Sequence, residues 1–132
     1  MPWGKVYKRE LFDQIAYPTD RAVEDDLTTW QVYLLADRLA FMNKPLNMHR
    51  KRTNSVTRET SQANVYPLEA IEQRVTMMAL LGMDITEELK AYRWRLGVHR
   101  DELLKSGSTN LVKYKNVMQR LRILEKAASK KQ

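Results

Sequence analysis

Apolar residues recur at helical spacing along most of this chain, and no segment keeps the period-two alternation of a half-buried strand. Residues three or four positions apart lie on one face of a helix, so such a series predicts an amphipathic helix. The strongest series lies near the C-terminus and comprises Leu111, Tyr114, Val117, Met118, Leu121 and Leu124. The pattern therefore predicts an all-α fold, a compact helical domain.

Proline and glycine divide this helical pattern into segments. Pro18 ends a short N-terminal helix, because the residue before a proline avoids the helical conformation. Gly82 and Gly97 are placed as helix C-terminal stops. The expected helices, five or six in number, cover residues up to about 17, 20–43, 67–81, 84–96, a short segment from 98, and 109–128. The tail 129–132 is expected to fray.

Size and composition fit one domain spanning residues 1–132. Of the 132 residues, 43% are hydrophobic, which suffices for a single core. The absence of cysteine excludes disulfides and thiolate metal sites. No apolar run is long enough for a membrane span, and no signal-peptide pattern is present, so we expect a cytoplasmic protein or one assembled into a larger particle made there. The formal net charge of +7 favours polyanionic partners.

A polar, basic segment without apolar periodicity extends over residues 44–65. We interpret residues 46–65 as an extended basic loop or arm, because loops of this length inside compact domains are usually functional or disordered. Its basic residues are candidates for contacts to phosphate oxygens, and they are Lys44, His49, Arg50, Lys51, Arg52 and Arg58. The alternative is a solvated loop that binds nothing.

The residues from Arg95 to Leu103, with Gly97 followed by Val98, resemble the turn and second helix of a helix-turn-helix motif. That resemblance implies a DNA-facing helix, with His99, Arg100 and Lys105 directed toward the groove. The sequence departs from the motif at Arg93, where a small residue would let the two helices approach. The alternative is a plain helical hairpin whose first helix ends at Gly97.

The expected C-terminal helix is basic outside its apolar stripe. Its candidate nucleic-acid contacts are Lys113, Lys115, Arg120, Arg122 and Lys126. A basic amphipathic helix can follow a nucleic-acid backbone, lie on an anionic membrane or dock in a groove of a partner protein. The alternative is a core helix with a solvated outer face. Trp94, Met77 and Met83 are candidate interface residues. The alternative for the two methionines is that they fill gaps in the core.

The sequence lacks the usual signs of catalysis. Its two histidines are not at metal-ligand spacing, and no glycine-rich phosphate loop or Gly-x-Ser-x-Gly motif occurs. The acidic pairs Asp25-Asp26 and Glu87-Glu88 lie near expected helix starts, where acids are common for electrostatic reasons. We therefore predict no enzymatic activity, no metal, no cofactor and no small-molecule substrate.

The leading hypothesis is a non-enzymatic protein that binds the phosphate backbone of DNA or RNA, of the kind that handles or regulates DNA in phages. A second hypothesis is a structural subunit of a large assembly, such as a virion or connector component, whose basic loop contacts neighbouring protein chains. A third is an inhibitor of an acidic protein partner. Protein partners or a homo-oligomer fit all three hypotheses.

Overall fold

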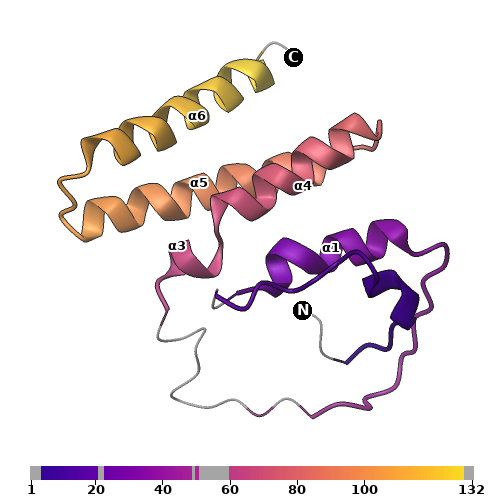
Figure 1. The fold of residues 1–132 in the computed structure, drawn as a ribbon. Helices are drawn as coiled ribbons and strands as arrows, with labels where there is room; N and C mark the ends of the chain where they lie inside the picture. The colour runs from indigo at the N-terminus through magenta and orange to yellow at the C-terminus, as the bar shows by residue number, and fades with distance from the viewer. Residues whose placement is uncertain (1–3, 21–22, 49, 51–59, 130–132) are drawn as a thin grey trace. The chain divides into compact units, whose positions relative to one another are not determined.

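The computed structural model describes residues 4–20, 23–48, 50 and 60–129, and in these ranges all regular structure is helical (Figure 1). This confirms the predicted all-α class. The four longer helices are slightly fewer than the predicted five or six. The elements are the 3-10 helix η1 (Arg9–Phe12) and the α-helices α1 (Asp25–Leu35), α3 (Gln62–Val65), α4 (Leu68–Leu80), α5 (Thr86–Lys105) and α6 (Leu111–Ser129).

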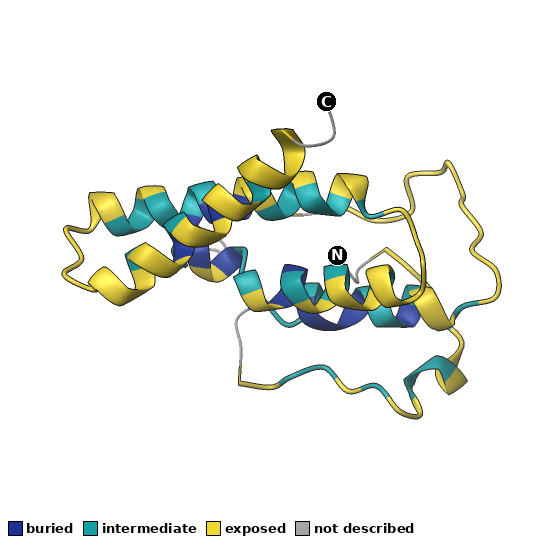
Figure 2. Cartoon of the chain, turned by 90° about the horizontal axis from the view of Figure 1, so that it is seen from above, coloured by how far each residue is buried: buried dark blue, intermediate teal, exposed yellow. Residues whose placement is uncertain are grey.

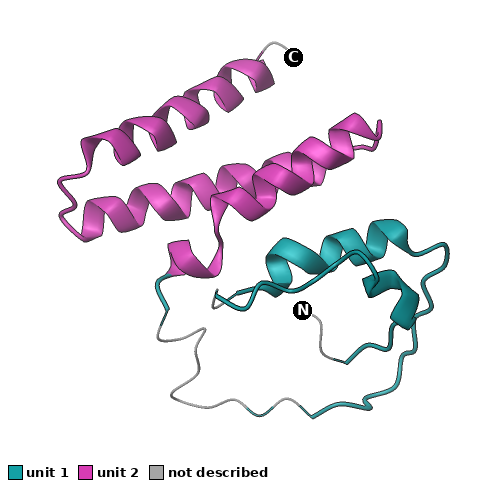
Figure 3. Ribbon diagram, in the orientation of Figure 1, with its two compact units in different colours: residues 1–61 teal, residues 62–132 magenta. Residues whose placement is uncertain are grey.

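The chain divides into two compact units, Met1–Ser61 and Gln62–Gln132 (Figure 3). Each unit is described on its own below. The single domain expected over residues 1–132 stays a prediction. Of the predicted frayed tail 129–132, Ser129 is instead the last residue of α6, and residues 130–132 lie outside the described part of the chain.

The first unit contains less helix than its apolar pattern predicts. Among the described residues before α1, only η1 is helical, and α1 begins at Asp25 and ends at Leu35, well inside the expected 20–43 helix. Ala36 has an extended backbone, and the apolar residues beyond it are exposed, with Phe41 at 90%. The pattern there has no packing partner within the described residues, and packing rather than propensity supplies most helix stability in proteins.

The second unit is built around α5, which contacts α3, α4 and α6. Leu96 of α5 is fully buried and packs with Val117 and Leu121 of α6 in the core of this unit. On α4, Ala70 and Ile71 are fully buried. Figure 2 shows that these helices bury only narrow strips and leave much of their surface exposed. The predicted C-terminal helix is confirmed, with Asn110 Oδ1 accepting a hydrogen bond from Lys113 N, 3.0 Å away, at its start.

The helix-turn-helix prediction is wrong, and so is its alternative of a plain helical hairpin, because Gly97 does not end a helix. Helix α5 runs without interruption from Thr86 to Lys105 and includes Gly97 near its middle. Gly82, in contrast, has a φ of 69° just after α4 and acts as the predicted C-terminal stop. Glycine permits a left-handed turn but does not require one, and the packing of α5 on both sides of Gly97 stabilises the helical conformation.

Gly97→Ala is expected to stabilise the protein by about 0.5–1 kcal/mol, because alanine loses less backbone entropy in a helix interior. An added Cβ there would meet no atom within 4 Å. Gly82→Ala is the matched control, since its site is equally open but its φ is +69°. That variant should lose about 1 kcal/mol through left-handed strain. Urea unfolding midpoints measure both, and changes of equal sign would contradict the assignment of Gly97 to a helix interior.

Candidate functional site

Four aromatic rings cluster where η1 meets α1 in the first unit. Tyr7 packs edge-on against Phe12 with ring centroids 5.6 Å apart, and Phe12 stacks on Tyr17 at 6.3 Å. Tyr7 also stacks on Tyr33 of α1 at 6.5 Å. Such pairs stabilise beyond their buried area, so they hold η1 and the segment after it against α1.

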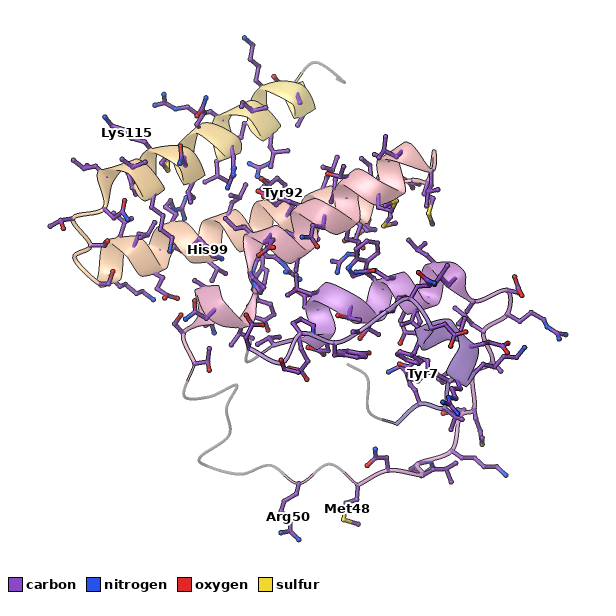
Figure 4. All side chains as sticks on the ribbon, viewed as in Figure 1. Tyr7, Met48, Arg50, Tyr92, His99 and Lys115 are labelled. Carbon is purple, nitrogen blue, oxygen red and sulfur yellow. The ribbon has the colours of Figure 1, made fainter. Side chains whose placement is uncertain are left out.

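The tyrosines of this cluster bring hydroxyl groups as well as rings. The hydroxyl of Tyr17 lies 3.2 Å from Oγ1 of the buried Thr29 in α1. The pKa of Tyr7 is raised to about 12, mainly because its hydroxyl is buried and secondly because Tyr33 lies beside it. Tyr7 (labelled in Figure 4) therefore keeps its proton at neutral pH, and its hydroxyl is buried without a hydrogen-bond partner among the described residues.

Two half-buried carboxylates, Asp25 and Asp26, lie in the first turn of α1. Their negative charge lies at the positive end of the helix dipole there. Asp25 and Asp26 lie four and three residues before Thr29, so both are neighbours of Thr29 on α1, on opposite sides of it and about 100° apart from each other. Of the two, Asp25 is the nearer in rotation to Thr29, about 40° away around the helix, at the position where Tyr17 meets Thr29.

The aromatic–carboxylate cluster, defined as Tyr7, Phe12, Tyr17, Tyr33, Thr29 and Asp25, combines ring faces, hydroxyls and one carboxylate. These are groups that can stack on the apolar face of a ligand, exchange hydrogen bonds with it and accept a proton. Nearby on α1, Trp30 Nε1 is buried without a hydrogen-bond acceptor among the described residues. Within the same part of the chain, no group of three or more His, Asp or Glu residues could hold a metal ion.

Sequence reasoning missed this cluster. The acidic pair was interpreted only as a helix start, and Tyr7 and Tyr17 were not singled out. The available signal was the regular spacing of Tyr7, Phe12 and Tyr17 ahead of an acidic helix start. Spacing of five residues matches neither a helix face nor a strand face, so it suggests no common surface until the 3-10 turn η1 brings the rings together.

The described residues include only part of the predicted basic loop. Lys44 and Arg50 are exposed in non-helical chain of the first unit, and Figure 4 labels Arg50. His49, Lys51, Arg52 and Arg58 lie outside the described residues. The end of the range expected to be a loop is instead the helix α3, whose Ala63 and Val65 are buried. Contacts of the loop with any ligand remain a prediction.

His99 is not a groove-facing residue, because α5 buries it against the corner between α3 and α4. Its Nε2 donates to the carbonyl oxygen of Tyr66 at 3.0 Å, and only 8% of the residue is exposed. One turn away, Nη1 of the buried Arg95 donates to Pro67 O at 3.0 Å. Glu102 accepts from the backbone N–H of Ala63 at 2.9 Å. This face of α5 therefore satisfies the backbone groups of a tight corner.

The other basic candidates are on the surface of the second unit. Arg100 pairs with its neighbour Asp101 at 2.8 Å, and Arg120 pairs with Glu72 at 3.3 Å. Glu72 also accepts a 2.6 Å hydrogen bond from Tyr92, which links α4, α5 and α6. The remaining candidates on α6 are exposed and form no ion pair within the described residues, and they are Lys113, Lys115, Arg122 and Lys126.

The three predicted interface residues are partly exposed. Trp94 is 52% exposed and packs edge-on against Tyr66 with ring centroids 4.9 Å apart. Met77 and Met83, near the α4–α5 turn, are each 43% exposed. Their role at an interface stays a prediction.

Comparison with known proteins points to a class that the sequence analysis did not consider. No family model matches the chain. Glycosyltransferase GlyA of Streptococcus pneumoniae serotype 4 is 31% identical over 123 residues, which cover 92% of this chain and 18% of GlyA. Glycosyltransferase GlyG of the same organism is 27% identical over 133 residues, covering 93% of this chain and 42% of GlyG. The chain therefore spans less than half the length of either relative.

These relatives overturn the predicted function. Both are named for an enzymatic activity, and neither name concerns nucleic acid, a virion or inhibition. The hypotheses of a nucleic-acid-binding protein, an assembly subunit and an inhibitor are therefore wrong, and the expected absence of enzymatic activity conflicts with the names. The error arose because net charge is a property that many unrelated basic proteins share. Among the described helices, none is both long and apolar enough to cross a membrane.

Proposed function

We propose that this chain is a segment of a glycosyltransferase and that its first unit contributes to binding the acceptor of the sugar. The observation that supports this most is the similarity to GlyA and GlyG, which extends over 92% and 93% of the chain. The matched segments have similar lengths but make up 18% of GlyA and 42% of GlyG. A segment similar to this chain therefore occurs in glycosyltransferases of different total length.

The chemistry of the aromatic–carboxylate cluster supports the second part of this proposal. Glycosyl transfer to a hydroxyl group requires that the acceptor oxygen lose its proton, and a carboxylate within hydrogen-bond reach can accept it. Asp25 is a half-buried carboxylate on the same face of α1 as the Tyr17–Thr29 pair. Aromatic rings with hydroxyl groups suit a ligand that has both C–H faces and hydroxyls.

Replacing the matching segment of GlyG with this chain tests the proposal. We expect the hybrid to retain the glycosyl transfer that GlyG catalyses, because the exchanged segment supplies equivalent groups. Intact GlyG and GlyG lacking the segment are the references, and circular dichroism with thermal melting checks that each protein is folded. A folded hybrid with no more activity than the deletion would contradict the proposal.

A further inference from the structure

The outward side of α6 carries two adjacent rows of exposed side chains. One row contains Lys115, Arg122 and Lys126, which are seven and four residues apart and so lie on one helix face. Beside it, Val112 and Ile123 are 71% and 59% exposed. The opposite side of the helix is the one that packs on α5 in the core. Figure 4 shows Lys115 on the side of α6 directed away from α5.

Ion pairs distinguish the outward row from the other charges of the helix. Arg120 pairs with Glu72 at 3.3 Å, and Glu125 pairs with Arg93 at 3.4 Å, so these residues fasten α6 to α4 and α5. The outward row has no ion pair within the described residues. From Lys113 to the C-terminus the sequence has seven basic residues and one acidic residue, Glu125. The unpartnered face is therefore strongly cationic.

We propose that this face of α6, called the cationic face and defined as Val112, Lys115, Arg122, Ile123 and Lys126, binds the surface of an anionic lipid bilayer. A helix lying in the plane of a bilayer inserts apolar side chains at the boundary of headgroups and acyl chains while its Lys and Arg side chains contact lipid phosphates. Val112 and Ile123 are the apolar side chains that insert at this boundary. Lys115, Arg122 and Lys126 contact the lipid phosphates.

The composition of the cationic face favours a lipid surface over an acidic protein. Protein interfaces concentrate their binding energy in Trp, Tyr and Arg anchors that fill pockets. The cationic face has no aromatic residue, and its exposed length of about 20 Å along the helix is a straight row. Such a row can contact a flat, charged surface at every turn, and its aliphatic residues enter only to a shallow depth.

Sedimentation of the full chain with vesicles tests the proposal. The vesicles contain phosphatidylcholine alone or phosphatidylcholine with about one third phosphatidylglycerol. We expect binding to the anionic vesicles only, weakened by salt. Each cation near an anionic surface contributes about fivefold to the affinity, so the triple variant Lys115→Gln, Arg122→Gln, Lys126→Gln should bind roughly 100-fold more weakly. The double variant Val112→Ser, Ile123→Ser should also lose affinity.

A matched triple variant tests whether binding depends on this face of α6 or only on the net charge of the chain. Arg38→Gln, Lys44→Gln, Lys105→Gln removes the same number of charges from exposed positions off α6 and should keep most of the binding. Equal losses in the two triple variants would overturn the proposal. So would failure of the unaltered chain to sediment with anionic vesicles, the result expected if the face serves an acidic protein instead. Circular dichroism confirms that each variant keeps its helices.

Discussion

Asp25→Asn in the GlyG hybrid is expected to lower the rate of glycosyl transfer by about 10²–10⁴-fold, the usual contribution of a positioned general base. The amide has nearly the same shape as the carboxylate but cannot accept the proton of an acceptor hydroxyl. The effect should fall on the catalytic rate more than on acceptor binding, because the aromatic rings and hydroxyls of the cluster remain. Initial rates at several acceptor concentrations separate the two quantities.

Asp26→Asn is the matched control for this prediction. Asp25 and Asp26 both lie in the first turn of α1, so each substitution removes a comparable interaction with the helix dipole. Because Asp26 is rotated by about 60° from Thr29 and lies on the other side of it, against about 40° for Asp25, its loss should change the rate less. Equal effects of the two substitutions would show that Asp25 acts only by stabilising the start of α1.

Leu96→Ala is expected to lower the free energy of unfolding of the second unit by about 2–5 kcal/mol. Leu96 is fully buried and packs with Val117 and Leu121 between α5 and α6. Truncation removes the transfer free energy of the side chain and leaves a cavity that neighbouring helices fill only partly. Since small domains are stable by only about 5–15 kcal/mol, this loss should be plain in urea unfolding followed by circular dichroism.

Leu104→Ala makes the same chemical change on the same helix and serves as the control. Leu104 is 60% exposed, so its truncation should cost at most about 0.5 kcal/mol. A comparable loss for both variants would mean that the core does not lie between α5 and α6. Because both substitutions replace leucine by alanine within α5, the difference in helix propensity cancels between them.

The helices of the second unit were largely predictable from sequence, because helical spacing relates residues only three or four positions apart. The apolar series of α4 and α6 recur at helical spacing, and each of these helices packs its stripe against a neighbour, so pattern and tertiary packing agree. Gly82 ends α4 as expected, since its positive φ suits glycine. The 20–43 helix was predicted too long because the same type of pattern continued beyond Leu35, where the chain is not helical.

The candidate site was not predictable in the same way. Arg95 and His99 appear in the sequence as basic residues near a glycine, yet α5 buries both against backbone carbonyls of Tyr66 and Pro67. The rings of Tyr7, Phe12 and Tyr17 meet only because η1 turns the chain before α1. Both arrangements depend on contacts between residues distant in sequence, which periodicity does not report.

The sequence by itself determined that this chain is helical, because helical spacing and capping act between residues a few positions apart. It also determined that basic residues are concentrated on the outer side of the last helix. Only the tertiary structure decided that Gly97 lies inside a continuous α5, that His99 is buried, and which cations of α6 are paired. Burial and ion pairing depend on which helices pack together, and that packing makes a basic residue either part of a core or part of a surface.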